Sequence, residues 1–383
     1  MKWKNLYIEK LVSGGLGLSR TESGIAFVSG VLPGETINGY QFKKTGGCPV
    51  IKAEEIVISS DKRIKPSCKY FNNCGACNWQ YMDYDIQSLQ KREIFTECMQ
   101  RIGKISKLPE IEIFKSEPWN YRLRTQIKIS KKSSGYFGGR TNTVVDIDKC
   151  MLLHEPLNRL FNKDVKFQRG IEQIKAIYGD KLSTDPVIPG LSDRETTIIV
   201  DNKAFLVPGK GFFQSNRYLL KELGTWAAEK ISGEFCLDIY GGVGFFSILL
   251  NSCFKKGILI DNMRLQTKYA KKNLINNGIK HFKAVCADAG DYLKAGNFPK
   301  VDCIIVDPPR IGLTKTVREN IGKIKPRYIL SVSCDSGTHA RDIGYFKNVL
   351  QYEIKDIALF DLYPQTSHME TIALLEYTGT KTV

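Results

Sequence analysis

Four cysteines have the number and spacing of a metal-binding set. Cys68, Cys74 and Cys77 stand in the stretch CKYFNNCGACNWQ, and Cys150 ends a later segment whose pattern predicts a β-hairpin able to return to this stretch. The first residues, MKWKNLYIEK, lack the apolar stretch of a signal peptide, so we expect a cytoplasmic location, where clustered cysteines serve metal binding or catalysis and not disulfides. Four thiolates bind either one zinc ion or an iron–sulfur cluster, and the spacing does not distinguish the two.

A set of carboxylates accompanies the strands predicted in the last part of the chain. Asp238, Asp261, Asp288 and Asp307 each stand near the end of an apolar segment, and the glycine turn of LDIYGGVGFF follows the first of them. Because the carboxyl ends of parallel strands line the ligand site of an open α/β sheet, we expect these carboxylates to meet at one rim. Four carboxylates would repel the pyrophosphate of NAD but suit a cationic sulfonium with a free ammonium group. The pattern therefore predicts S-adenosylmethionine as the cofactor.

A possible nucleophile stands at the same rim. The segment YILSVSC predicts a strand that ends at Cys334, while Arg310 follows the double proline of VDPPR, where amine-methylating enzymes commonly carry an aromatic residue. A thiolate that adds to carbon 6 of uracil makes carbon 5 nucleophilic, and a base must then remove the proton of carbon 5. His368 and Glu370 are the candidate bases. A thiol that only packs at the end of a strand remains the alternative for Cys334.

Three kinds of sequence pattern indicate how these residues are positioned. The first sixty residues alternate short apolar runs with glycines, which predicts a small β-barrel of the OB type. A mixed α+β segment follows, and from residue 211 strands alternate with helices as in a doubly wound, mostly parallel α/β sheet. We therefore expect domains at 1–58, 59–210 and 211–383. Lys and Arg (56) outnumber Asp and Glu (40), which favours a polyanionic partner.

Taken together, these motifs resemble the RNA uracil-5-methyltransferase family, and most closely its iron–sulfur 23S rRNA members with an N-terminal TRAM domain. The resemblance is carried by the cysteine set and by the segments LVSGGLGLSR, GFFQSN, LDIYGGVGFF, VDPPRIGL, SVSCDSGTHARD and HMETIALL. It implies a Rossmann-like methyltransferase domain that methylates carbon 5 of a uridine in 23S rRNA, with Cys334 as the nucleophile and Glu370 as the base. The same reaction on tRNA is the second possibility, and a non-catalytic RNA-binding iron–sulfur protein is the third.

The resemblance also implies roles for further residues. The positions that match the family's S-adenosylmethionine site are Gln214, Tyr240, Phe245, Asp261, Asp288 and Asp307. Cys68, Cys74, Cys77 and Cys150 match the ligands of a 4Fe–4S cluster, which we expect to tie the hairpin near residue 150 to the Cys68–Cys77 stretch. Phe212 falls where the flipped base would stack, and Arg122 and Arg124 fall in a segment that faces RNA.

Three positions depart from the family pattern. Gly241 stands where cysteine is usual, Asp261 replaces a glutamate, and Asp335 replaces the asparagine after the nucleophile. We expect the change at Gly241 to matter little and Asp261 to reach the ribose diol. An extra negative charge at Asp335 is expected to raise the pKa of the Cys334 thiol.

Overall fold

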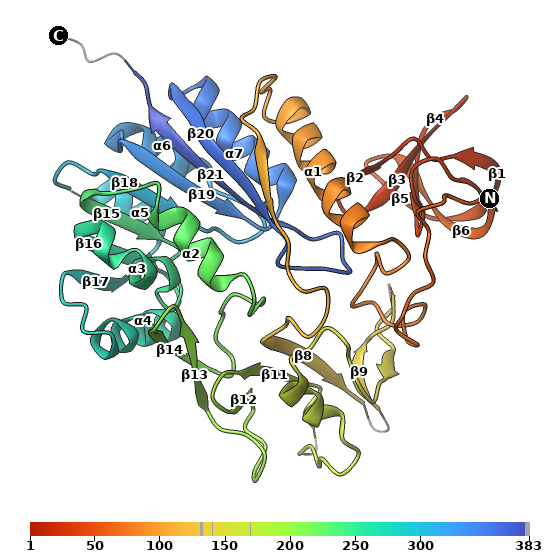
Figure 1. The fold of residues 1–383 in the computed structure, drawn as a ribbon, viewed down its shortest axis with the longest axis horizontal. Helices are drawn as coiled ribbons and strands as arrows, with labels where there is room; N and C mark the ends of the chain where they lie inside the picture. Colours follow the sequence, from red (N-terminus) through yellow and green to blue (C-terminus); the bar gives the residue numbers. More distant parts are fainter. Residues whose placement is uncertain (131–132, 140, 169, 297, 380–383) are drawn as a thin grey trace.

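An eight-stranded sheet dominates the second half of the chain in the computed structural model, which describes all residues except 131–132, 140, 169, 297 and 380–383 (Figure 1). In spatial order, its strands are β17 (Phe282–Cys286), β16 (Phe254–Asp261), β15 (Gly233–Ile239), β18 (Cys303–Val306), β19 (Tyr328–Ser333), β21 (Glu370–Tyr377), β20 (Tyr352–Phe360) and β7 (Ile111–Phe114). The first five are parallel, and β21 runs antiparallel to both of its neighbours. The predicted doubly wound, mostly parallel sheet is confirmed.

Helices cover both faces of this sheet. One face packs against α1 (Tyr84–Arg101), α5 (Ala289–Ala295), α6 (Lys315–Ile324) and α7 (Ser336–Asn348), and the other against α2 (Leu220–Ala228), α3 (Phe245–Leu249) and α4 (Arg264–Asn276). Successive residues of a strand point to opposite faces of the sheet. Leu237 and Ile239 belong to the core on the side of α1, and Cys236 belongs to the core on the side of α2. Because both faces are buried, the strands read as continuous apolar runs in the sequence.

Two elements of the segment 59–210 belong in space with the large sheet. Strand β7 pairs in parallel with the edge strand β20, and α1 lies beside α7 with Ile94 and Phe95 in the core beneath it (Figure 1). Helix α1 begins after Asp83, whose side chain accepts a hydrogen bond from the backbone N–H of Asp85. The domain boundaries at residues 58 and 210 therefore remain a proposal. The contacts of β7 and α1 with the large sheet cross the boundary at residue 210.

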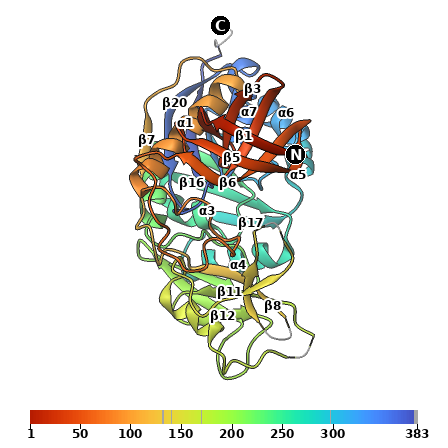
Figure 2. The same cartoon turned by 90° about the vertical axis from the view of Figure 1, so that its right-hand side faces the viewer.

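The first 58 residues form a six-stranded sheet with a small apolar core. Its strands, in spatial order, are β1 (Lys2–Tyr7), β5 (Thr36–Thr45), β6 (Cys48–Ile58), β4 (Gly24–Ser29), β3 (Leu16–Thr21) and β2 (Lys10–Val12). Only Ile8 and Glu9 separate β1 from β2, the two ends of this order, so the sheet curls back on itself (Figure 2). The buried Glu35 accepts hydrogen bonds from the Arg63 guanidinium at 2.6 and 2.7 Å and so fastens this sheet to the following segment.

The middle of the chain adds a five-stranded sheet and a two-stranded ribbon. The sheet has the order β10 (Val144–Asp146), β9 (Ser134–Phe137), β8 (Arg124–Ile129), β11 (Gln173–Tyr178) and β12 (Leu182–Asp185), and the ribbon pairs β13 (Glu195–Val200) with β14 (Lys203–Pro208). The predicted hairpin before Cys150 is present as β9 and β10. Residues 59–83, which contain three of the cysteines, follow a path of turns and bends. Within the described residues, no helix combines the length and the apolar character needed to cross a membrane.

Candidate active site

Strand register brings Cys334 and Glu370 together. Ser333, the last residue of β19, pairs with Thr371 of the antiparallel β21. Cys334 follows Ser333 and Glu370 precedes Thr371, so this register sets Cys334 opposite Glu370. Burial, together with the negative charges of Glu370 and Asp307, raises the pKa of the Cys334 thiol to about 12. A thiol and a carboxyl group thus lie side by side at the carboxyl end of the sheet.

Glu370 is a buried acid with a cation nearby. Its pKa lies well above the ordinary range because the side chain is buried, and Asp307 adds to this effect. The Arg310 guanidinium opposes the shift and lowers the pKa of both Glu370 and Cys334. His368, the other candidate base, lies at the exposed rim with its Nε2 atom 3.4 Å from Arg310 Nη2. Glu370 is therefore the better-placed base. The sequence analysis assigned no role to Arg310, although its place in the VDPPR motif was a usable signal.

Asp335 has a different role from the one expected. Its carboxylate accepts a hydrogen bond from the backbone N–H of Thr338 at 2.8 Å and caps α7. The high pKa of Cys334 comes first from burial and then from Glu370 and Asp307. The expected rise in pKa is thus present, but its causes lie in other residues.

The glycine turn after β15 is shaped by Asp261. The Asp261 carboxylate accepts hydrogen bonds from the backbone N–H of Gly242 at 3.0 Å and from that of Met263 at 2.8 Å. Gly242 has a positive φ of 57°, a conformation that glycine adopts without strain. A Cβ at Gly241 would come too close to Leu259 Cγ, so a side chain at this position would require Leu259 to move.

A pocket opens beside this turn. Of the predicted cofactor residues, Gln214, Tyr240, Phe245 and Asp307 line it, together with Phe212. Gln214 Nε2 donates a hydrogen bond to Asp307 Oδ2 at 3.0 Å, whereas the buried Gln214 Oε1 has no hydrogen-bond partner among the described residues. A free acceptor next to a carboxylate suits a cationic ligand with N–H donors. The pocket therefore fits the ammonium and sulfonium groups of S-adenosylmethionine.

The other carboxylates of the predicted rim lie outside the lining of this pocket. Asp238 is buried, and its Oδ2 atom accepts hydrogen bonds from the Ser247 N–H and hydroxyl at 3.0 and 2.6 Å, so that it holds the start of α3. The exposed Asp288 caps α5. Burial and the nearby Asp238 raise the pKa of Asp307 to about 7. Of the four expected carboxylates, Asp307 alone lines this pocket, and the buried Oδ1 atom of Asp238 has no hydrogen-bond partner among the described residues.

The predicted RNA residues lie at the mouth of the pocket and behind it. The Phe212 side chain is 47% exposed, and the Arg124 guanidinium carbon lies 4.7 Å from the centre of its ring. Arg122 is half-buried, and its Nε atom has no hydrogen-bond partner in the described part of the chain. Its positive charge lowers the pKa of Cys77 and of Tyr363, so Arg122 lies within electrostatic reach of both the cysteines and the loop before Glu370.

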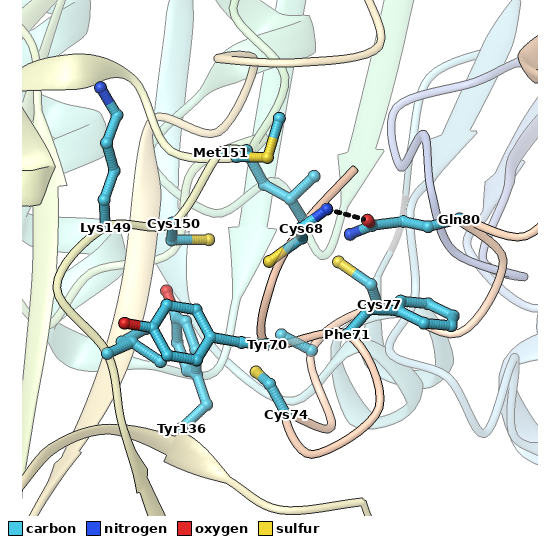
Figure 3. A pocket seen from close by; sticks show the side chains of 13 residues that line it. Cys68, Tyr70, Phe71, Cys74, Cys77, Gln80, Tyr136, Lys149, Cys150 and Met151 are labelled. Atoms are coloured by element: carbon cyan, nitrogen blue, oxygen red, sulfur yellow. Dashed lines mark hydrogen bonds between the residues drawn. The ribbon is translucent and has the colours of Figure 1, made fainter. Parts of the chain in front are cut away.

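The four cysteines line a second pocket (Figure 3). All four are free thiols, and their sulfur atoms point toward a common space between the Cys68–Cys77 stretch and the segment at Cys150. Gln80 accepts a hydrogen bond from the backbone N–H of Cys68, and Asn158 accepts one from that of Cys150. The structure thus brings together the two segments that the sequence analysis expected to meet.

The four thiols are not arranged as a metal-binding group. Across the described ranges, no group of three or more His, Cys, Asp or Glu side chains is placed to hold one metal ion. Burial raises the pKa of the Cys77 thiol to about 12 and also raises that of Cys150. Four soft sulfur donors around one pocket remain chemically suited to iron–sulfur ligation.

Known proteins resemble this chain in sequence and in fold. Residues 194–378 match the model of the family described as tRNA (Uracil-5-)-methyltransferase. An uncharacterized RNA methyltransferase of Aquifex aeolicus is 31% identical, over 97% of this chain and 98% of its own length, and one of Bdellovibrio bacteriovorus is 28% identical, over 97% and 94%. The crystal structure of Pyrococcus abyssi tRNA (uracil-54, C5)-methyltransferase with S-adenosyl-L-homocysteine has the same fold, with a TM-score of 0.75 and 24% identity, over 97% of this chain and 99% of that one.

Proposed function

Since the chain belongs to the RNA (uracil-5-)-methyltransferase family and is therefore an S-adenosylmethionine-dependent enzyme, we propose that it methylates carbon 5 of a uridine in 23S rRNA through a covalent adduct of Cys334. The observation that carries this proposal is the strand register that sets Cys334 against Glu370 beside the Asp307 pocket. A binding protein would need no thiol and no buried acid at this place.

The two residues divide the reaction between them. The Cys334 thiolate adds to carbon 6 of uracil, and carbon 5 then becomes nucleophilic and takes up the methyl group. Glu370 accepts the proton of carbon 5, the electron pair of that C–H bond restores the ring double bond, and the bond between carbon 6 and sulfur breaks. The nearby Arg310 lowers the pKa of both groups, which favours the thiolate and the carboxylate that these steps require.

The pocket beside the glycine turn is proposed to hold the methyl donor. When bound, S-adenosylmethionine supplies a methyl group on a positively charged sulfur. Gln214 Oε1 is a free acceptor for its ammonium group, and Asp307 in its ionised form attracts the positive charges. Asp261 has acceptor capacity left beyond its two backbone hydrogen bonds, and Asp288 stands at the end of the next strand. The lining positions of Gln214 and Asp307 support their expected cofactor roles, whereas the roles of Asp261 and Asp288 rest on the resemblance.

Residues around the pocket mouth support an RNA substrate. Uracil must leave its stack to admit a thiolate at carbon 6 and a methyl donor at carbon 5. The exposed ring of Phe212 offers a stacking surface for such a base. Arg124, Gln126 and Lys128 stand at alternate positions of β8, and this row of polar side chains starts at Phe212. We expect it to contact phosphates of the flanking nucleotides.

The cysteine pocket is proposed to hold a 4Fe–4S cluster with Cys68, Cys74, Cys77 and Cys150 as ligands. The support is the chemistry of the four thiols and their common pocket. Methyl transfer needs no electron, so we assign the cluster a structural part in joining the two segments. The curled N-terminal sheet is proposed to act as a TRAM-like RNA-binding domain.

A tRNA substrate is the second candidate. The Pyrococcus abyssi protein that shares the fold over the whole chain, including the N-terminal sheet, is a tRNA enzyme. The presence of the N-terminal sheet therefore does not decide between the two RNAs. The substrate proposal rests on the resemblance to the 23S rRNA members and needs a direct test.

The test supplies the protein with labelled S-adenosylmethionine and, separately, with unmodified 23S rRNA and unmodified tRNA, and then resolves the labelled nucleosides. We expect 5-methyluridine from 23S rRNA and a loss of roughly 10⁴-fold or more in Cys334→Ala, because removal of a nucleophile removes the covalent pathway. Label in tRNA alone would contradict the rRNA assignment and keep the chemistry. Label in neither RNA would support the binding-protein alternative.

A further inference from the structure

The loop between β20 and β21, residues 361–369, leads directly into Glu370 and is held by side chains from a distant part of the chain. Asn78 Nδ2 donates to Ser367 Oγ at 3.0 Å, and the backbone N–H of Ser367 donates to Asn78 Oδ1 at 2.9 Å. The backbone N–H groups of Asn78 and Trp79 also donate to the carbonyl of Gln365. Asn78 thus has contacts with two residues of the loop.

Two residues of α1 hold the earlier part of the same loop. Gln87 exchanges two hydrogen bonds with Gln365, one to its side chain at 3.0 Å and one from its backbone N–H at 2.8 Å. Lys91 forms a fully buried ion pair with Asp361 at 2.6 Å. Gln365 has a positive φ of 67°, which a residue other than glycine keeps only where its surroundings fix it. The loop therefore has one defined shape, to which hydrogen bonds within it and side chains from outside both contribute.

Asn78 differs from the residues of α1 because of where it stands. It directly follows Cys77 in the segment 59–83, which has no helix or strand to hold it, whereas Gln87 and Lys91 sit on a long helix. The position of Asn78 is set by the cysteine pocket on one side and by Ser367, three residues before Glu370, on the other. A short chain of contacts thus joins the cysteine pocket to the base.

We propose that Asn78 is a positioning residue for Glu370 and connects the cysteine pocket with the catalytic centre. This proposal rests on the proposed function of Glu370 as the base. In that reaction Glu370 acts only after methyl transfer, when the proton of carbon 5 leaves and the Cys334 thiolate is released. Displacement of Glu370 therefore slows release of the RNA and leaves formation of the adduct intact.

The test compares full-length holoenzyme variants in a single turnover with S-adenosylmethionine and whichever unmodified RNA, 23S rRNA or tRNA, accepts the label. Covalent RNA–protein adduct is followed on a denaturing gel. In Asn78→Ala we expect adduct release to slow by about 10- to 100-fold, the effect of a small misplacement of a catalytic group. Iron content and affinity for S-adenosylmethionine should stay at the wild-type level. Asn78→Asp, which retains the acceptor for the Ser367 N–H, should release faster than Asn78→Ala.

Three further variants make the result specific. Asn348→Ala removes an asparagine whose amide links α7 to the carbonyl of Gly103, far from the loop, and should release RNA normally. Ser367→Ala removes only the hydrogen bond from Asn78 Nδ2 to Ser367 Oγ and should slow release less than Asn78→Ala does. The double variant should release RNA no more slowly than Asn78→Ala, since Asn78→Ala already removes that bond. Glu370→Gln should trap the adduct.

The outcomes separate the two proposals. If Glu370→Gln traps no adduct, the assignment of the base is wrong. If Glu370→Gln traps the adduct while Asn78→Ala releases it at the wild-type rate, the assignment of the base stands and the positioning role of Asn78 is overturned. Loss of methyl transfer in Asn78→Ala without accumulated adduct would also overturn it.

Discussion

The two pockets of this protein are built in different ways. The proposed catalytic centre lies at the ends of β18, β19 and β21, where the hydrogen bonds of the sheet position Asp307, Cys334 and Glu370. The cysteine pocket lies between turns, and its walls meet through side-chain hydrogen bonds such as that from the backbone N–H of Asp148 to the Tyr70 hydroxyl at 3.2 Å. The first pocket needs only the fold, whereas the second would gain rigidity from the proposed cluster.

This difference assigns different tasks to the two regions. A sheet that orders its own strand ends can position reacting groups without help. The turns around the cysteines have little regular structure, so a bound cluster would hold the chain there and, through Asn78, the loop before Glu370. Each of the following predictions compares one region with the other.

The largest effect is expected at the cysteine pocket. In Cys74→Ser one of four proposed ligands is lost, and we expect loss of bound iron, a decrease in the free energy of unfolding on the order of 5 kcal/mol or more, and weaker RNA binding. Iron content, urea unfolding and RNA affinity measure these effects. Affinity for S-adenosylmethionine should change little, since its pocket belongs to the sheet.

The matched control is Cys286→Ser, which alters an exposed cysteine at the end of β17. It should retain iron and stability, because an exposed side chain without a ligand role contributes little. A soluble Cys74→Ser protein that lacks iron yet is fully active would contradict the structural role of the cluster.

The second prediction concerns the buried ion pair of Lys91 and Asp361, which anchors the loop before Glu370. Lys91→Met leaves the carboxylate of Asp361 buried without its cation, and we expect a loss of about 3–5 kcal/mol in the free energy of unfolding. The iron content of the protein that remains folded should stay unchanged, because the pair joins α1 to the loop before Glu370 and does not involve the cysteines. Urea unfolding and iron analysis test both points.

Lys255→Met is the control for this change. Lys255 pairs with Glu234 at 2.8 Å, but the two side chains are 75% and 70% exposed. Exposed pairs contribute little, so no measurable change in the free energy of unfolding is expected. Equal losses in the free energy of unfolding of both variants would show that burial does not increase the contribution of the Lys91–Asp361 pair to stability.

The sequence was informative where short-range patterns decide the structure. Apolar strands followed by Asp307 or Cys334 indicated the rim of the sheet, because side chains at strand ends of this fold face the ligand. The partners of Asn78 and Lys91 could not be predicted, since Ser367 and Asp361 lie 289 and 270 residues away. The buried Gln87 and Lys91 also read as ordinary polar residues of a helix. Pairing of β7 with β20 was hidden for the same reason.

The smallest of these effects is a pH dependence in the cofactor pocket. The pKa of Asp307 is raised from its ordinary value of 3.8 to about 7, so the folded protein keeps this proton at pH values where the unfolded chain has lost it. The stabilisation from the neutral carboxyl group is thus complete below about pH 4 and is lost as the pH rises toward 7. Binding of a cation has the opposite requirement, because it favours the ionised carboxylate.

Affinity for S-adenosylmethionine should therefore fall as the pH decreases below 7, by up to about tenfold for each pH unit. Titration calorimetry between pH 5.5 and 7.5 measures it, with proton release as a second signal. Asp307→Asn has no proton to lose, so its binding should be weaker at pH 7.5 and should vary much less with pH over this range. An equally steep pH dependence in Asp307→Asn would assign the effect to another group of the sheet, and a flat profile in the wild type would mean that Asp307 does not meet the positive charges of the cofactor.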